Sequence, residues 1–159
     1  MDIQRIEELV NKHSNMILQI AYQNTFNMQE AEDITQEVFI KLMSNISKLE
    51  SEEHIKAWLI RVTINLCRDH NKSFWNKNTY ELDEDIKYFD KEKDGEVLAE
   101  LAKLKPNHRN VIYLYYYQGY KINEIAQILN MNSNTVSSLL TRARSELKDV
   151  LTKGDEVYA

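Results

Sequence analysis

Apolar residues recur at helical spacing in three segments of the first half of the chain. The spacing predicts helices over residues 3–24, 29–46 and 53–74, each with one stripe that faces a core. The expected core positions are Ile6, Leu9, Val10, Ile17 and Ile20, then Ala31, Ile34, Val38 and Leu42, then Ile55, Trp58, Leu59, Val62 and Leu66.

Four further helical segments are predicted in the second half, near residues 95–103, 106–118, 121–129 and 133–152. Pro106 fits the first turn of its helix, where a missing N–H costs nothing. Gly119 is suited to end that helix in a left-handed conformation. These segments predict a small four-helix domain.

The stretch 77–94 separates the two halves and lacks a continuous apolar stripe. It carries 4 basic and 7 acidic residues, which favours an acidic linker extended by self-repulsion, with a solvated helix as the alternative. We therefore predict an all-α protein with an N-terminal helical bundle (residues 1–76), an acidic linker (77–94) and a C-terminal domain (95–159).

The amino-acid composition excludes several other classes of protein. Three Gly and one Pro in 159 residues are too few for a turn-rich β sandwich or barrel. One Cys excludes a disulfide framework within a monomer. The N-terminus lacks the pattern of a signal peptide, and the chain has no apolar run of transmembrane length. We expect a cytoplasmic protein that does not insert into membranes by itself.

Residues 121–152 have the spacing of a helix-turn-helix, whose second helix enters the major groove of DNA. Asn130 tolerates the left-handed backbone of a turn, and Asn132 can cap the second helix. The two inner faces are predicted as Ile122, Ile125, Ala126 and Leu129, and Val136, Leu140, Ala143 and Leu147. The outward positions are Asn134, Ser137, Ser138, Thr141, Arg142 and Ser145, with Arg144 and Lys148 at the flank. These side chains suit base edges and phosphates, although a merely solvated helical hairpin is the alternative.

The segment 101–147 resembles the C-terminal promoter-binding domain of bacterial sigma factors, particularly the small extracytoplasmic-function (ECF) group. The resemblance is carried by Leu101, Leu104, Pro106, Arg109, Gly119, Glu124-Ile125-Ala126, Thr135-Val136 and Arg142-Ala143-Arg144. It implies binding of the −35 element by Asn134, Ser137, Ser138, Thr141, Arg142 and Arg144. Two departures are Asn130, in place of the usual turn Gly, and Ser137 with Leu139, where basic residues are usual. The second departure implies a lower phosphate affinity for this helix.

The second predicted helix carries a polar face of Asp33, Gln36, Glu37 and Lys41. Clustered carboxylates can serve acid–base chemistry or metal binding, or can simply be solvated. No His-Glu-x-x-His occurs and no His follows a Glu by three residues, so we expect neither a metal nor another cofactor.

The sequence around this face resembles the sigma-factor signature that docks on the clamp helices of RNA polymerase, with Ala31, Asp33, Gln36, Glu37, Val38 and Phe39 as the matching residues. The resemblance implies that the polymerase contacts are Asp33, Gln36, Glu37, Phe39 and Lys41. Exposed apolar neighbours such as Phe39 or Met43 are expected to contribute binding energy.

The third predicted helix collects basic charge in a stripe of Arg61, Asn65, Arg68 and Lys72. With Trp58, Phe74 and Trp75 nearby, the stripe is typical of a surface that tracks a nucleic-acid strand, although such stripes also serve solubility. Ala57-Trp58-Leu59, Arg61, Asn65 and Arg68-Asp69 resemble the sigma-factor segment that binds and melts the −10 element. The implied contacts are Lys56, Trp58, Arg61, Asn65, Arg68 and Lys72, with Trp58 either a melting wedge or part of the core.

We therefore expect a sigma factor without catalytic activity. The resemblance implies that it binds the clamp helices of the largest polymerase subunit, the flap of the second largest, promoter DNA and an anti-sigma factor. The formal charge of −5 argues against tight DNA binding by the chain alone.

Two other classes stay open. One is a dimeric helix-turn-helix regulator that binds an operator alone. Its candidate dimer surface is the helix with Tyr113, Tyr115, Tyr116 and Tyr117, although we expect these tyrosines to pack the domain core. The other is a helical adaptor that binds only protein.

Overall fold

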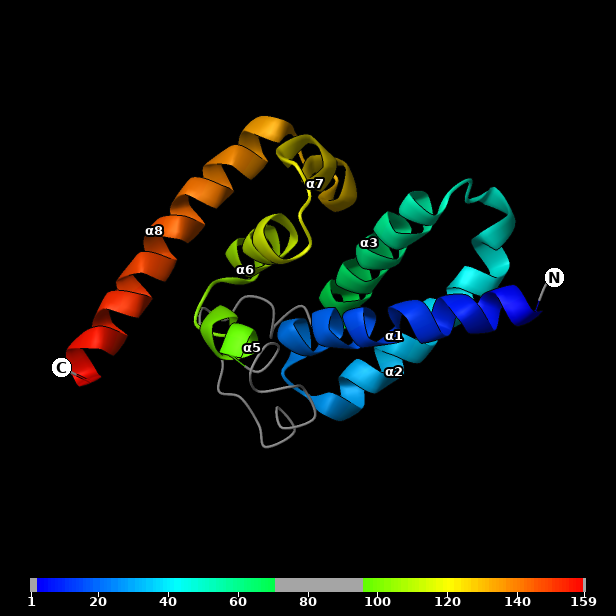
Figure 1. The fold of residues 1–159 in the computed structure, drawn as a ribbon, viewed down its shortest axis with the longest axis horizontal. Coiled ribbons are helices and arrows are strands. Elements are labelled where there is room, and N and C mark those ends of the chain that lie inside the picture. The colour runs from blue at the N-terminus through cyan, green and yellow to red at the C-terminus, as the bar shows by residue number, and fades with distance from the viewer. Residues whose placement is uncertain (1–2, 71–95, 159) are drawn as a thin grey trace. The chain divides into compact units, whose positions relative to one another are not determined.

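A computed structural model describes residues 3–70 and 96–158, and every regular element in those ranges is helical (Figure 1). This confirms the all-α prediction. The chain divides into two compact units, residues 1–75 and 76–159. The predicted linker 77–94, the end of the helix predicted to reach residue 74, and Lys72 lie outside the described residues.

The first unit contains α1 (Ile3–Thr25), α2 (Met28–Asn45), a 3-10 turn η1 (Ile46–Lys48) and α3 (Glu52–His70). Helices α1, α2 and α3 all pack against one another, so they form a three-helix bundle. The centre of the bundle is a set of side chains with essentially no exposure: Ile17, Ile20, Tyr22, Ala31, Ile34, Val38, Leu42, Leu59 and Ile60.

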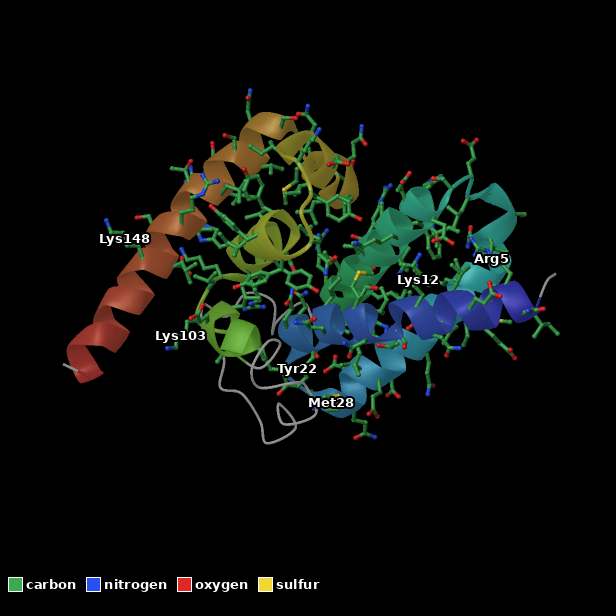
Figure 2. The ribbon with its side chains drawn as sticks, viewed as in Figure 1. Arg5, Lys12, Tyr22, Met28, Lys103 and Lys148 are labelled. Carbon is green, nitrogen blue, oxygen red and sulfur yellow. The ribbon has the colours of Figure 1, made fainter. Side chains whose placement is uncertain are left out.

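The turn between α1 and α2 is set by local hydrogen bonds and one left-handed residue. Phe26 has φ 51°, and its ring meets the ring of Tyr22 edge to face at 5.8 Å. Asn27 caps α2, since its Oδ1 accepts the backbone N–H of Glu30 at 2.9 Å. Tyr22 and Met28 lie on either side of this turn (Figure 2). The short turn places α2 directly alongside α1.

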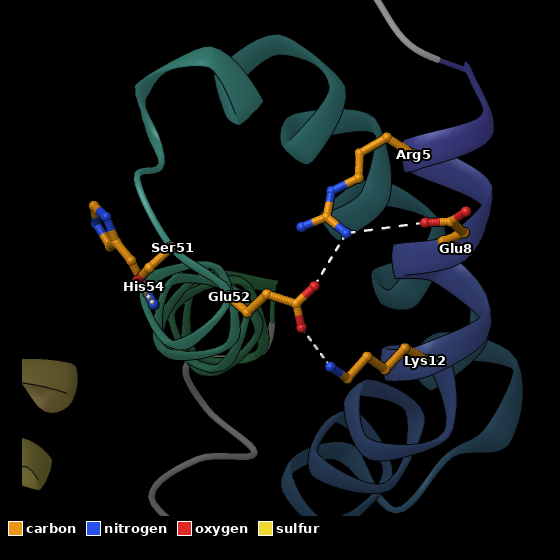
Figure 3. Close-up of polar contacts among 6 residues, drawn as sticks. All are labelled: Arg5, Glu8, Lys12, Ser51, Glu52 and His54. Atoms are coloured by element: carbon orange, nitrogen blue, oxygen red, sulfur yellow. Dashed lines mark hydrogen bonds and ion pairs between the residues drawn. The ribbon is translucent and has the colours of Figure 1, made fainter.

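Ion pairs connect α1 to the start of α3 (Figure 3). Glu52, in the first turn of α3, pairs with Arg5 at 3.0 Å and also with Lys12. The hydrogen bonds from Lys12 and then Arg5 lower the pKa of the Glu52 carboxyl. A carboxylate at a helix N-terminus is also favoured by the helix dipole. Since the pKa is lowered, this contribution to stability is present at neutral pH and is lost as acid protonates Glu52.

His13 lies on the inner face of α1, with 5% of its surface exposed. Its Nε2 has no hydrogen-bond partner among the residues that the structure describes. Burial lowers the pKa of His13, and the positive charges of Lys12, Lys56 and Arg5 lower it further, whereas Glu52 opposes them. The folded state therefore favours the neutral imidazole.

We expect the first unit to lose stability as the pH falls below the ordinary histidine pKa of about 6.5. The unfolded chain takes up a proton on His13 in that range, whereas the folded chain resists it. His13→Leu should flatten this dependence, measured as urea midpoints at about pH 7.5 and about pH 5.5. His54→Gln, a change at an exposed histidine, should leave it intact. An unchanged slope in His13→Leu would contradict the assignment.

The second unit contains α5 (Glu96–Leu101), α6 (Pro106–Ile112), the π-helical turn η4 (Tyr113–Tyr117), α7 (Ile122–Leu129) and α8 (Ser133–Tyr158). Helix α8 packs against both α6 and α7. Pro106 stands in the first turn of α6 and Gly119 has φ 73°, as predicted.

One buried and one half-buried polar side chain fix the packing of α5, α6 and α8. Arg109 is 1% exposed, and its Nε and Nη2 donate to the carbonyl oxygens of Leu101 and Leu104 at 3.0 and 2.9 Å. Leu101 is the last residue of α5, where a cation is favoured, and Leu104 lies in the turn before α6. Glu146 of α8 accepts the backbone N–H of Lys105 at 3.1 Å and contacts Nδ1 of His108 at 3.0 Å. The turn between α5 and α6 is thereby tied to α8.

Candidate protein- and nucleic-acid-binding surfaces

The outward face of α2 combines acidic and apolar side chains. Asp33 and Gln36 are exposed, and Glu37 is half-buried. Ile40 is 64% exposed and Met43 is 42% exposed. Because Ile40 follows Asp33, Gln36 and Glu37 by seven, four and three residues, it lies between them on the helix surface. We call Asp33, Gln36, Glu37, Ile40 and Met43 the α2 face.

Phe39 does not belong to this face, so the prediction that it is an exposed contact is wrong. Its side chain is 9% exposed and lies beside Val38, on the side of α2 that packs into the bundle. The exposed apolar residue is its neighbour Ile40, which the sequence reasoning missed. The available signal was that Ile40 is apolar yet out of phase with Ile34, Val38 and Leu42. Lys41 is exposed, as predicted.

Glu37 links the α2 face to α3. Its Oε2 lies 3.1 Å from Nε2 of His70, and both side chains are about 40% exposed. Surface pairs of this kind contribute only about 0–1 kcal/mol to stability. The Glu37 carboxylate is therefore held in place but remains accessible to a partner.

Helix α3 buries a different stripe from the predicted one. Ile55 and Leu59 are buried as expected, but Trp58, Val62 and Leu66 are only half-buried. The rest of the buried face is Ile60, Thr63, Ile64 and Cys67. Because α3 packs against both α1 and α2, it needs a wide apolar face. Its sequence has two adjacent apolar stripes, and the prediction chose the one that is less buried. Trp58 is thus excluded from the core centre.

The outward face of α3 carries Arg61 and Asn65, both exposed. Trp58 precedes them by three and seven residues, so all three share one side of the helix. Arg68 is half-buried near the same side. Lys56 does not join them: it is half-buried, and its charge acts on His13, on the side facing α1. Of the predicted −10 residues, the structure groups Trp58, Arg61, Asn65 and Arg68, which we call the α3 face.

The second unit contains the predicted helix-turn-helix. Asn130 ends α7 with φ 55° and ψ 49°, a left-handed conformation. Asn132 caps α8, because its Oδ1 accepts the backbone N–H of Thr135 at 2.8 Å. Ser133 then donates to Asn123 Oδ1 at 2.9 Å, which ties the start of α8 to α7. The orientation of α8 against α7 is therefore set by both polar and apolar contacts.

The outer face of α8 is polar and solvent-exposed. Val136, Leu140 and Ala143 are buried, and Leu147 is half-buried. The predicted −35 residues are all exposed: Asn134, Ser137, Ser138, Thr141, Arg142 and Arg144. Residues 133–141 carry no charge, so the basic side chains of this face begin at Arg142. Hydroxyl and amide groups at the start of a recognition helix are suited to base edges.

The tyrosines of η4 do not all pack in the core, contrary to our expectation. Tyr113 is 2% exposed, and its hydroxyl accepts a hydrogen bond from Gln118 Nε2 at 2.8 Å. Tyr116 and Tyr117 are 51% and 49% exposed. Both exposed rings thus lie on the outer side of the π-helical turn η4.

Two other kinds of site are absent from the described residues. No group of three or more His, Cys, Asp or Glu side chains there could hold a metal ion. No described helix has the length and apolarity that a membrane crossing requires.

Two family descriptions match the chain. "Sigma-70 region 2" matches residues 9–75, and "Sigma-70, region 4" matches residues 94–147. The two matches coincide with the units that carry the α2 and α3 faces and the helix-turn-helix.

Curated relatives match over most of both chains. One is "RNA polymerase sigma factor YlaC" of Bacillus subtilis (strain 168), 31% identical, with 95% of this chain and 94% of the relative covered. Another is "ECF RNA polymerase sigma factor SigW" of the same organism, 30% identical, covering 91% and 87%.

Two solved structures share the fold. The first is described as "Structure of CnrH in complex with the cytosolic domain of CnrY" and gives a TM-score of 0.71 at 22% identity, covering 96% of this chain and 90% of that one. The second is the sigma factor RpoE in complex with the anti-sigma factor NepR from Bartonella quintana, with a TM-score of 0.70 at 18% identity, covering 94% and 98%.

Proposed function

This chain belongs to the sigma-70 family of RNA polymerase sigma factors, in the ECF group, and from that premise we propose which surfaces carry its partners. The α2 face binds the polymerase core enzyme, the α3 face binds the −10 element, and α8 reads the −35 element. The chain then acts by binding and positioning, with no catalytic step of its own. The observation that carries this proposal is the α2 face, where exposed apolar and acidic side chains meet on one helix.

The α2 face has the composition of a protein-binding surface. Ile40 and Met43 expose apolar area that the bundle does not use, and burial of such residues supplies most of the binding energy in protein interfaces. Asp33, Gln36 and Glu37 surround them, and polar groups at the rim set register and exclude wrong partners. The clamp helices of the largest polymerase subunit are the proposed partner.

The α3 face and α8 are proposed to share the DNA contacts. Arg61 and Arg68 supply charge for phosphates, and Trp58 presents part of an aromatic ring for an unstacked base. On α8, Ser137, Ser138 and Thr141 offer hydrogen bonds to base edges, and Arg142 can bind a guanine or a phosphate. In this proposal, the first unit binds the −10 element and the second unit binds the −35 element.

An anti-sigma factor is proposed as a further partner, on the strength of a similar sigma factor, RpoE, solved in complex with NepR. The half-buried apolar side chains Trp58, Val62 and Leu66 of α3 are suited to such a partner, because covering them would also mask Arg61 and Asn65. The flap of the second-largest polymerase subunit is the proposed partner of the second unit.

Glu37→Ala is expected to weaken binding to the polymerase core enzyme by about 10-fold or more, because it removes a charge-assisted contact at the edge of the α2 face. The measurement is the affinity of the full chain for a matched bacterial core enzyme, by co-elution and by titration of a labelled chain. Since Glu37 is half-exposed, its loss should leave the thermal midpoint nearly unchanged.

Two controls separate this contact from other effects of the substitution. Glu7→Ala makes the same charge change at an exposed position on α1 and should keep full affinity. His70→Gln removes the intramolecular pair but leaves the carboxylate, and should also keep affinity. Equal binding by wild type and Glu37→Ala would refute the docking assignment. Failure of the wild type to bind the core enzyme, with DNA binding by a dimer of the chain, would favour the stand-alone regulator instead.

A further inference from the structure

The guanidinium of Arg144 lies against two tyrosines of η4. Its Nε donates to the hydroxyl oxygen of Tyr116 at 2.6 Å. Its central carbon is 5.5 Å from the ring centroid of Tyr115 and 5.6 Å from that of Tyr116. The two rings meet edge to face, with centroids 4.9 Å apart. Arg144 is therefore held by a hydrogen bond and by two cation–π contacts.

This cluster lies at the surface and is not needed to fill the core. Tyr116 is half-exposed and Arg144 is exposed. Among the described residues, no carboxylate forms an ion pair with Arg144. The nearby Glu146 is engaged with His108 and the backbone of Lys105. The guanidinium is thus oriented, since its contacts restrict the rotamers of a long side chain, yet its charge is not neutralised.

The exposed residues that neighbour Arg144 on α8 indicate which chemical group its charge is suited to bind. Ser137, Thr141, Arg144 and Lys148 follow one another by four, three and four residues, so they form one exposed stripe. Lys148 projects from α8 in Figure 2. The Thr141 hydroxyl already donates to the carbonyl of Ser137 at 3.1 Å. The donors that this stripe offers to a phosphate therefore include the Ser137 hydroxyl and the Arg144 guanidinium.

We propose that Tyr116 is a positioning residue for promoter binding, which holds Arg144 so that its outward edge contacts a DNA phosphate beside the groove read by α8. The inference rests on the proposed function of α8. A planar guanidinium binds a phosphate through two parallel hydrogen bonds, which demands orientation as well as charge. Because residues 133–141 are uncharged, a preoriented Arg144 supplies phosphate affinity that the start of the helix lacks.

The test compares two adjacent tyrosines in the holoenzyme, assembled from the full chain and a matched polymerase core enzyme. Tyr116→Phe keeps the ring and removes the hydroxyl that holds Arg144. Tyr117→Phe is the matched control, because Tyr117 is equally exposed but stacks on Tyr113 instead. The probe is a genomic DNA fragment selected by the wild-type holoenzyme, and the dissociation constant is measured over a series of salt concentrations.

Tyr116→Phe is expected to weaken DNA binding by about 2- to 5-fold, and Tyr117→Phe should have no effect. Arg144→Ala should weaken binding more and reduce the salt-dependence slope by about one phosphate contact. In the Arg144→Ala background, Tyr116→Phe should cause no further loss. Thermal midpoints should not move, which separates positioning from a structural role.

Equal affinities of the two Phe variants, or additive losses in the double variant, would overturn this inference but leave the proposed function of α8 intact. Loss of core-enzyme binding in Arg144→Ala, with DNA binding by the remaining holoenzyme unchanged, would assign the cluster to a polymerase surface and also overturn it. A wild-type chain that forms no DNA-binding holoenzyme would refute the proposed function itself, and this inference with it.

Discussion

Arg109→Met is expected to destabilise the second unit by about 3 kcal/mol, the largest stability effect that we predict. The substitution keeps an unbranched side chain but removes the donors that serve the carbonyl oxygens of Leu101 and Leu104. In a unit of this size, such a loss lowers the melting temperature by about 12 °C or more. The measurement is thermal unfolding followed by circular dichroism, with hydrogen exchange in α6 to assign the transition to this unit.

Arg142→Met is the matched control, because it removes an exposed guanidinium from the same unit and should change the melting temperature little. Arg109→Lys keeps the charge but not the fork of donors, and should lie between the two. A melting temperature for Arg109→Met equal to that of Arg142→Met would show that the buried hydrogen bonds do not hold α5 and α6 together.

Replacing both Ile40 and Met43 by Gln is expected to weaken binding to the polymerase core enzyme by about 30-fold or more, the largest functional effect. Gln is uncharged and forms helices well, so the change removes apolar contact area without adding charge or breaking α2. Both side chains are exposed in the free chain, so their stability contribution is small. The affinity is measured by titration of a labelled chain with the core enzyme.

Ile3→Gln provides the control, because Ile3 is the most exposed large apolar side chain among the described residues, at 71%, and lies on α1. It should bind as the wild type does. If the double variant and Ile3→Gln bind equally well while the wild type binds tightly, the polymerase contacts lie elsewhere than on the α2 face. Loss of binding by Ile3→Gln as well would indicate a larger interface that includes the start of α1.

The helices themselves were predictable because the information for them is local. Their apolar spacing, Pro106 in the first turn of α6, and the left-handed residues Asn130 and Gly119 all depend on neighbours within one or two turns. The Asn132 cap was predicted for the same reason. The helix-turn-helix could thus be recognised without knowing what packs against it.

The packed face of each helix was less predictable, and the errors have one physical cause. Phe39 and Ile40 are adjacent apolar residues, and only the contacts of α2 with α1 and α3 decide that Phe39 is buried and Ile40 exposed. On α3, Trp58, Val62 and Leu66 form as good a stripe as the residues that are buried. When a helix has two adjacent apolar stripes, its own sequence favours neither for burial. The spacing of apolar residues therefore does not decide which stripe packs against the other two helices.

The polar contacts between different elements could not be predicted from the sequence. By itself, the sequence determined an all-helical chain with two units, a helix-turn-helix and an acidic polar face on α2, since these follow from composition and short-range spacing. Only the tertiary structure decided that Arg109 is a buried cap for α5, that Glu37 meets His70, and that Tyr116 holds Arg144. Glu37 and His70 are 33 residues apart, and Tyr116 and Arg144 are 28 apart; they meet because packed helices bring residues that are distant in the sequence together. The partners of Arg109 are only 8 and 5 residues away, but they lie across the turn between α5 and α6, whose path depends on the packing of the unit.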